Sequence, residues 1–146
     1  MIIVQESYEK FYNERLDILE KHYNEVEYPR SGGSIKAAEG FYEDADLNGD
    51  LHIFVAYEGE DFLGYIIFLE TLNYHDMDTS IARSDLLYVV PDKRNSGVAI
   101  EMISFAEEYF KELGVECITL GVPKEMNFIE DLGYNKGQVT YYKRLS

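Results

Sequence analysis

A hydrophobic segment that ends at a proline and runs into a glycine-containing turn constrains the fold of this chain more than any other feature. Residues 86–90 have the composition of a β-strand, and Pro91 ends that strand because proline lacks a backbone N–H. Lys93 and Arg94 lie in the polar turn that follows, and Gly97 opens an amphipathic helix. The unpaired N–H groups and the positive dipole end of a helix favour anions, and a glycine lets a phosphate approach the backbone. The turn therefore predicts a pyrophosphate site between a strand and a helix.

Length and composition predict one globular domain over residues 1–146. Of these residues 46% are hydrophobic, which is enough for one buried core. No hydrophobic run approaches the length of a membrane span and the N-terminus lacks a signal-peptide pattern, so a cytoplasmic location is expected. Cys117 is the one cysteine, so no internal disulfide is possible, and its hydrophobic neighbours predict a buried thiol rather than a nucleophile.

The charge of the chain is strongly acidic. It contains 13 Lys and Arg residues against 28 Asp and Glu residues, for a formal net charge of −15. A nucleic-acid-binding protein needs a basic face, so that class is not expected. Eleven acidic residues and no Lys or Arg lie between Ala37 and Ala82. This block would attract a cation such as a polyamine, an amino sugar or a lysine side chain, or it is a solvated surface that keeps the protein soluble.

Hydrophobic periodicity and turn signals predict a mixed order of strands and helices. Ser7 is a candidate N-cap for the first helix, and residues 58–61 have the composition of a tight hairpin turn. The predicted strands cover residues 1–4, 51–57, 62–72, 81–90, 116–122 and 139–145, and the predicted helices cover about 7–26, 34–45, 97–114 and 126–132.

Arg94, Gly97 and Ala99 have the spacing Arg-x-x-Gly-x-Ala after a strand that ends at Pro91. With a strand before it and a helix after it, this spacing resembles the acetyl-CoA signature R/Q-x-x-G-x-G/A of the GNAT superfamily of N-acetyltransferases. The predicted order of elements is similar to that superfamily over nearly the whole chain, and the C-terminal half resembles small members often carried by phages. The resemblance implies an α/β (α+β) GNAT acyl-CoA N-acyltransferase fold, with a mixed central sheet of about six or seven strands flanked by about four helices.

The resemblance also implies a site for acetyl-CoA as co-substrate, and no metal. The fourth strand would part from the fifth at its C-terminal end, so that Leu87, Tyr88 and Val89 could pair with the pantetheine arm. The N–H of Val89 or of a neighbour would stabilise the oxyanion. An amine would then attack the thioester directly, without a cysteine nucleophile. The pyrophosphate would lie on the turn and the first helical residues, Arg94, Asn95, Ser96, Gly97, Val98 and Ala99.

An ammonium is not a nucleophile, so direct transfer needs a base that takes the proton of the acceptor amine. Three candidates lie close together in the chain: Glu70 near the end of the third predicted strand, His75 in the next loop and Asp85 on the fourth strand. Histidine titrates closest to neutral pH, whereas either carboxylate could act through a water molecule. The sequence leaves these three alternatives open.

Phe128 and Ile129 align with a Phe-Tyr pair that many members of the superfamily carry on the last helix. The resemblance implies a cofactor contact for Phe128, but Ile129 cannot donate a proton to the departing CoA thiolate. Thiols ionise near pH 8–9, so the thiolate is a tolerable leaving group without an acid. Tyr134, Tyr141 or Tyr142 could take the place of the missing tyrosine.

Residues 44–53 match the first ten positions of an EF-hand calcium loop. Val55 stands where that loop needs a bidentate glutamate, and a strand pattern follows where a helix should begin. We therefore interpret the segment as the end of a helix followed by a turn at Asn48 and Gly49.

Two functions of different classes remain. The first is an acetyl-CoA-dependent N-acetyltransferase that acts on a primary amine of a cationic acceptor, either a small molecule or a protein. The second is an acyl-CoA-binding or acidic interaction protein of the same fold with weak or no catalysis, which Ile129 and the net charge of −15 favour. The expected partners are acetyl-CoA and an amine acceptor, without nucleic acid or membrane, and a second copy of the chain, because members of this fold are commonly dimers.

Overall fold

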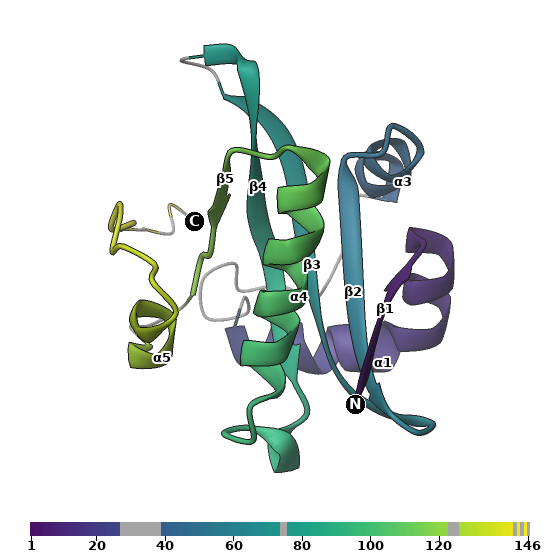
Figure 1. The fold of residues 1–146 in the computed structure, drawn as a ribbon. Coiled ribbons are helices and arrows are strands. Elements are labelled where there is room, and N and C mark those ends of the chain that lie inside the picture. The colour runs from purple at the N-terminus through teal and green to yellow at the C-terminus, as the bar shows by residue number, and fades with distance from the viewer. Residues whose placement is uncertain (27–38, 74–75, 123–125, 142, 144, 146) are drawn as a thin grey trace. The chain divides into compact units, whose positions relative to one another are not determined.

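The computed structural model describes residues 1–26, 39–73, 76–122, 126–141, 143 and 145. Two compact units divide the chain: Met1–Glu14 with Ala38–Gly121, and Arg15–Ala37 with Val122–Ser146. Figure 1 shows the elements. In chain order they are β1 (Ile2–Glu6), α1 (Tyr8–Val26), α3 (Glu39–Leu47), β2 (Leu51–Glu58), β3 (Asp61–Asn73), β4 (Asp76–Val89), the short 3-10 helix η1 (Pro91–Lys93), α4 (Val98–Leu113), β5 (Cys117–Thr119) and α5 (Asn127–Asp131).

The first unit contains a mixed sheet of five strands in the order β1-β2-β3-β4-β5 (Figure 1). Neighbouring strands from β1 to β4 are antiparallel, and β5 runs parallel to β4 at the edge of the sheet. This arrangement confirms the predicted mixed sheet with flanking helices, although the number of strands is lower than the predicted six or seven.

Two predictions near the C-terminus are wrong. No strand forms at residues 139–141, 143 and 145, the described part of the predicted last strand, and Val139, Tyr141 and Leu145 are 59%, 92% and 91% exposed. The thiol of Cys117 is exposed rather than buried, because among the described residues β5 is a three-residue strand at the edge of the sheet. β-branched and aromatic residues favour a strand only where a neighbouring surface buries them.

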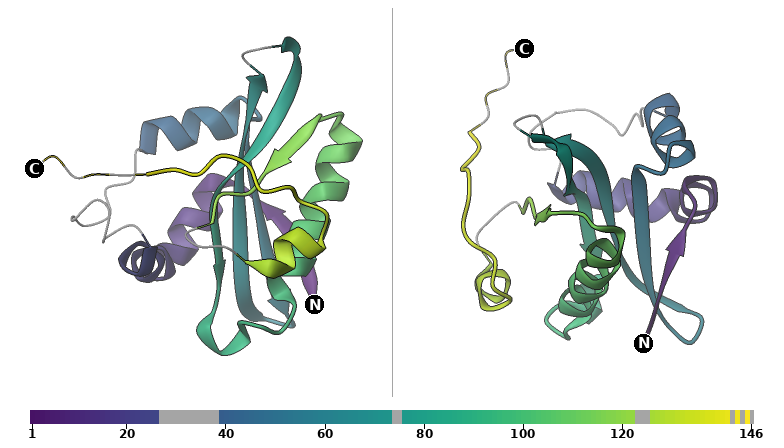
Figure 2. Two further views of the ribbon diagram at one scale, coloured as in Figure 1. Left: turned by 90° about the vertical axis from the view of Figure 1, so that its left-hand side faces the viewer. Right: turned by 45° about the horizontal axis from the view of Figure 1, so that its top comes forward.

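Aromatic side chains pack on both faces of the sheet. Phe68 of β3 packs edge-on against Phe110 of α4, with ring centroids 5.1 Å apart. Tyr65, three residues earlier and therefore on the opposite face, packs edge-on against Phe11 of α1 at 4.9 Å and stacks on Tyr88 of β4 at 5.6 Å. Figure 2 shows α4 and α3 on opposite sides of the sheet.

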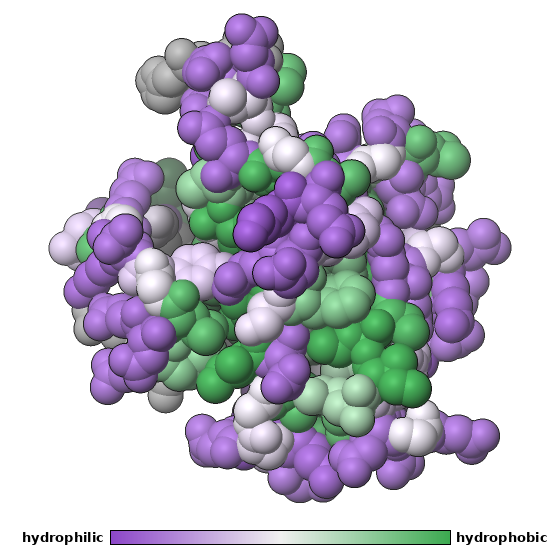
Figure 3. Space-filling view, in the orientation of Figure 1, coloured by the Kyte–Doolittle hydropathy of each residue, from purple (hydrophilic) through white to green (hydrophobic). Residues whose placement is uncertain are grey.

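α4 is amphipathic, as the sequence predicts. Its buried residues are Val98, Met102, Ile103, Ala106 and Phe110. On the side of the molecule that carries α4, Figure 3 shows mostly hydrophilic side chains with hydrophobic ones exposed between them. Ile100 and Phe105 of this helix are 37% and 38% exposed, which is ordinary for a protein surface.

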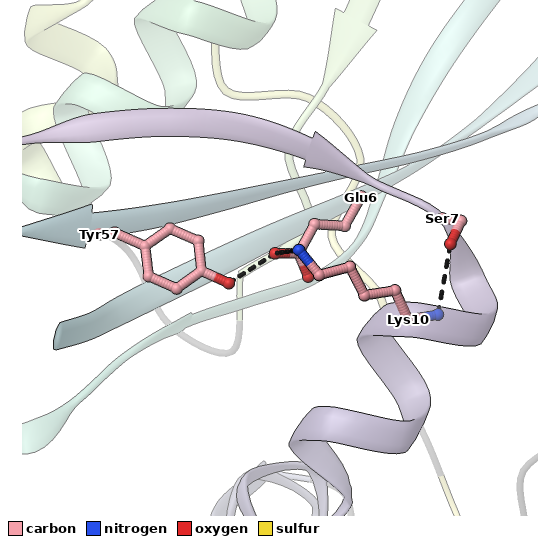
Figure 4. A network of polar contacts seen from close by, with 4 residues as sticks. All are labelled: Glu6, Ser7, Lys10 and Tyr57. Atoms are coloured by element: carbon pink, nitrogen blue, oxygen red, sulfur yellow. Dashed lines mark hydrogen bonds and ion pairs between the residues drawn. The ribbon is translucent and has the colours of Figure 1, made fainter. Parts of the chain in front are cut away.

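Ser7 caps the start of α1 as predicted. Its Oγ accepts a hydrogen bond from the backbone N–H of Lys10 at 3.3 Å. The adjacent buried carboxylate of Glu6 accepts a hydrogen bond from the hydroxyl of Tyr57 at 2.5 Å, and the Lys10 ammonium lies 3.5 Å from the same oxygen (Figure 4). These contacts join β1, β2 and the first turn of α1.

The segment that resembles a calcium loop is the end of α3, a turn and the start of β2, which confirms its interpretation. Asp46 uses its Oδ2 to accept a hydrogen bond from the N–H of Tyr8 at 3.2 Å. Among the residues that the structure describes, no group of three or more His, Cys, Asp or Glu could hold a metal ion. Within the same residues, no helix is long and apolar enough to cross a membrane. The predicted start of the second helix, residues 34–38, lies outside the described part of the chain.

Candidate functional site

β4 is paired on both sides along only part of its length. β5 pairs with it at three positions, where Ile81, Ala82 and Arg83 face residues 117–119. β3 remains paired with β4 as far as Val89. Beyond these pairs, Oγ of Ser84 still accepts a hydrogen bond from the N–H of Gly121 at 2.8 Å, whereas residues 86–89 pair with β3 and not with β5. Residues 87–90 are the strand end at which the sequence predicts that the two strands part.

Some peptide groups in this stretch of β4 point away from β3, toward the side on which β5 pairs with residues 81–83. The N–H of Val90 donates to the Leu63 carbonyl of β3 at 2.9 Å. Because the bonding direction alternates along an antiparallel pair, the peptide groups of Leu87 and Val89 point away from β3. The carbonyl of Val89 accepts a hydrogen bond from the Nε of Arg94 at 2.8 Å. The Arg94 side chain thus connects the strand end to the turn.

Residues 91–97 form a tight turn between β4 and α4. Asn95 and Gly97 have positive φ angles of 65° and 91°. Such angles are strained for most residues, and glycine adopts them without a steric penalty. The hydroxyl of Ser96 donates to the Lys93 carbonyl inside the turn. These bonds fix the path of the backbone immediately before the helix.

α4 begins at Val98 without a side-chain cap, since its N-cap residue is Gly97. The first N–H groups of an α-helix have no partner within that helix. A Cβ at Gly97 would have no heavy atom within 4 Å, so the space beside the turn is open and a side chain would enter it. An open, uncapped N-terminus of a 16-residue helix fits a phosphate-bearing ligand.

Gly64 of β3 lets the end of β4 lie unusually close. A Cβ at this position would lie 2.3 Å from the Tyr88 carbonyl oxygen and 3.1 Å from the Cα of Val89. Gly64 is not among the site residues predicted from the sequence, although a glycine inside a strand pattern is itself a signal of close backbone approach.

Asp85 is the extra residue of a β-bulge in β4. Ile67 of β3 pairs with Leu86 and the next residue, Phe68, pairs with Ser84, so Asp85 has no residue opposite it in β3. Its Oδ2 accepts a hydrogen bond from the hydroxyl of Tyr42 in α3 at 2.8 Å. Nothing in the sequence indicates Tyr42, because the contact joins residues 43 positions apart.

The other two candidate bases lie elsewhere. Oε1 of Glu70 is 3.1 Å from Nε2 of His52. His52 is buried and packs edge-on against Tyr109 and Phe110 of α4, so this pair faces α4, whereas Asp85 is bonded to α3. The structure therefore does not bring Glu70 and Asp85 together. His75 lies outside the described residues.

Phe128 and Ile129 lie in α5, which belongs to the second compact unit, whereas the turn and the end of β4 belong to the first. The side chain of Ile129 is buried. The predicted contact between Phe128 and the cofactor stays a prediction. Tyr134 and Tyr141 also belong to the second unit, and Tyr142 is not among the described residues.

A family model, a curated relative and several solved structures are similar to this chain. The model of the acetyltransferase (GNAT) family matches residues 8–134. The uncharacterized N-acetyltransferase YhfO of Bacillus subtilis (strain 168) is 27% identical over 114 residues, which cover 75% of this chain and 76% of YhfO. The crystal structure of a ribosomal-protein-alanine N-acetyltransferase from Brucella melitensis biovar Abortus 2308 has a TM-score of 0.72 at 15% identity, covering 99% of this chain and 100% of that one. A predicted acetyltransferase with acetyl-CoA from Clostridium acetobutylicum has a TM-score of 0.72 at 14% identity, covering 99% and 97% of the two chains.

The chain therefore belongs to the acetyltransferase (GNAT) family and is an N-acetyltransferase by class. Its fold is the GNAT fold, here with five strands in one mixed sheet. Enzymes of this family use acetyl-CoA together with an acceptor substrate.

Proposed function

We propose that this protein transfers an acetyl group from acetyl-CoA directly to a primary amine of a cationic acceptor. One observation carries the proposal: the parted end of β4 leads through a fixed turn into the uncapped N-terminus of α4. A strand end with outward-facing peptide groups suits an extended amide-containing arm, and an uncapped helix start suits a pyrophosphate. Acetyl-CoA contains both groups, and it also supplies the activated acetyl group.

The cofactor-binding residues are proposed along this path. Leu87, Tyr88 and Val89 would hold the pantetheine arm, with the buried Tyr88 ring anchoring the strand. The guanidinium of Arg94 lies 5.5 Å from the centre of the Tyr88 ring and holds the Val89 carbonyl, so its part is to fix the strand end as well as to add positive charge. The pyrophosphate would lie against the backbone of Arg94, Asn95, Ser96, Gly97, Val98 and Ala99.

The chemistry follows from the same placement. The N–H of Val89 would stabilise the oxyanion, and holding the amine beside the thioester would supply most of the rate. Asp85 is the carboxylate that we assign to receive the proton of the amine, directly or through water, because it lies on the same strand as Val89. Glu70, which is bonded to His52, and His75 are the other candidates.

Free-thiol release with a panel of spermidine, kanamycin and a lysine-containing peptide tests this proposal. At least one amine is expected to raise thiol release above the hydrolysis rate of acetyl-CoA alone, with the acetylated amine detected by mass spectrometry. Acetyl-CoA binding without acetylation of any amine would instead support the acyl-CoA-binding alternative, which the buried Ile129 favours because it cannot donate a proton.

We also propose a cytoplasmic location, a homodimer and a single domain over residues 1–146. The chain is further proposed to be similar to small phage-borne members of the family. The family match over residues 8–134 supports the single domain.

A further inference from the structure

Tyr42 of α3 is bonded to one of the candidate catalytic carboxylates. We propose that Tyr42 is a positioning residue that fixes Asp85 as the ammonium-binding carboxylate of the acceptor subsite, between α3 and the bulge of β4. This inference rests on the proposed function and deepens it, because it assigns the face on which the acceptor binds.

The hydrogen bond itself is well formed. The Tyr42 hydroxyl lies 2.8 Å from Oδ2 of Asp85, which is within the usual range for a hydroxyl donating to a carboxylate. Asp85 is exposed and Tyr42 is half-buried, so the carboxylate is accessible while its donor is anchored. A carboxylate offers about four acceptor positions, and the hydroxyl of Tyr42 occupies one of them.

Tyr42 packs against the first residue of α1, Tyr8. Its ring stacks on the ring of Tyr8, with centroids 5.7 Å apart and planes 13° from parallel. The N–H of Tyr8 donates to Asp46 of the same helix as Tyr42, at 3.2 Å. Two contacts therefore fix α3 to the first turn of α1, and a side chain locked in this way can hold its partner in one orientation.

The backbone of β4 also affects how Asp85 is placed. As the extra residue of a bulge, it is placed differently from the regular pleat of β4, and bulges commonly redirect a side chain. The bulge lies between the residues paired with β5 and the end of β4. The Tyr42 bond thus favours one orientation of this exposed carboxylate.

The surrounding charge suits a cation. α3 contains four acidic residues and no Lys or Arg, so the charge of this helix attracts an ammonium and repels a carboxylate-bearing acceptor. A flexible surface aspartate in such a field would bind cations without a preferred orientation. The hydroxyl of Tyr42 supplies the orientation that transfer to a thioester requires.

A double-mutant cycle with Tyr42→Phe and Asp85→Asn tests the inference. The assay uses the amine of the panel with the highest kcat/KM. Tyr42→Phe is expected to lower kcat/KM for the amine about tenfold while KM for acetyl-CoA changes by less than about twofold. In the Asp85→Asn background the same change should lower kcat/KM by less than about twofold further, because the carboxylate that Tyr42 orients is gone.

Tyr57→Phe is the matched control. It removes another tyrosine-to-carboxylate hydrogen bond, the one from Tyr57 of β2 to Glu6 of β1, which involves neither α3 nor β4. This variant should lower thermal stability but leave kcat/KM for the amine unchanged. Additive effects of Tyr42→Phe and Asp85→Asn, or an unchanged kcat/KM in Tyr42→Phe, would overturn the inference.

If acetyl-CoA binds but no amine of the panel is acetylated, the proposed function is wrong. The proposed ammonium subsite is then tested separately, by calorimetric titration with spermidine. Spermidine affinity that falls at least about fivefold in both Tyr42→Phe and Asp85→Asn supports the subsite. Equal spermidine binding by the wild type and both variants, or no binding by any of them, contradicts it.

Discussion

Replacing Gly64 by alanine is expected to damage the candidate site from the neighbouring strand. The added Cβ would lie 2.3 Å from the Tyr88 carbonyl oxygen and 3.1 Å from the Cα of Val89. A carbon and a carbonyl oxygen come no closer than about 3.3 Å, so the two backbones must separate by about 1 Å. Both contacts are to backbone atoms, and the side-chain Cε of Met102 lies only 3.3 Å from the same Cβ. The strand end therefore has to move as a whole.

Two consequences follow from that displacement. Overpacking of this kind destabilises a protein by about 1–3 kcal/mol, which thermal unfolding measures. A shift of about 1 Å in a positioned group can lower the rate about 100-fold, so kcat/KM for acetyl transfer is expected to fall far more than stability alone explains. Circular dichroism at the assay temperature shows whether the variant is folded, which separates a loss of activity at the site from a loss of stability.

Gly40→Ala is the matched control, since a Cβ at Gly40 of α3 would meet no atom within 4 Å. This variant is expected to be as stable as the wild type or up to about 1 kcal/mol more stable, because alanine favours a helix. A Gly64→Ala variant with wild-type stability and wild-type kcat/KM would refute the claim that the end of β4 is held in place through Gly64.

Three further outcomes are expected. Ser7→Ala should lower the free energy of unfolding by about 1 kcal/mol through loss of the N-cap of α1, with no change in acetyl-CoA affinity; an unchanged unfolding midpoint would contradict the cap. Cys117→Ser should retain kcat within about twofold, because direct transfer uses no thiol nucleophile, and mass spectrometry that traps an acetyl group on Cys117 would contradict direct transfer. Asp85→Asn should lower kcat/KM at least about tenfold more than Glu70→Gln, and the reverse order would transfer the role of base to Glu70.

Local signals in the sequence predict most of the fold. A hydrophobic strand, Pro91, a polar turn and Gly97 define the junction between β4 and α4, because each of these residues restricts the backbone through its own geometry. Ser7 marks the start of α1 for the same reason, through a bond three residues away. The family signature then supplies the order of the remaining elements.

The errors arise where the outcome depends on distant parts of the chain. Residues 139–142 are the β-branched and aromatic types that favour a strand, but composition does not tell whether a partner strand is present. Cys117 lies in a hydrophobic run, yet an edge strand leaves it exposed. The bulge at Asp85 and its bond to Tyr42 depend on the register of β4 and on α3, and the sequence contains no local signal for either.

The most direct test of the account is acetyl-CoA binding at the turn between β4 and α4. Thermal unfolding with acetyl-CoA should show stabilisation of the wild type, by about 2.7 kcal/mol at 100 times Kd. Gly97→Glu combined with Arg94→Ala should lose this stabilisation, because a carboxylate would enter the open space beside the helix start. Gly59→Glu, which also places glutamate at a glycine with positive φ but in the β2–β3 turn, should keep it. No stabilisation of the wild type at millimolar acetyl-CoA, or equal stabilisation of all three proteins, would contradict the assignment of this turn as the acetyl-CoA site.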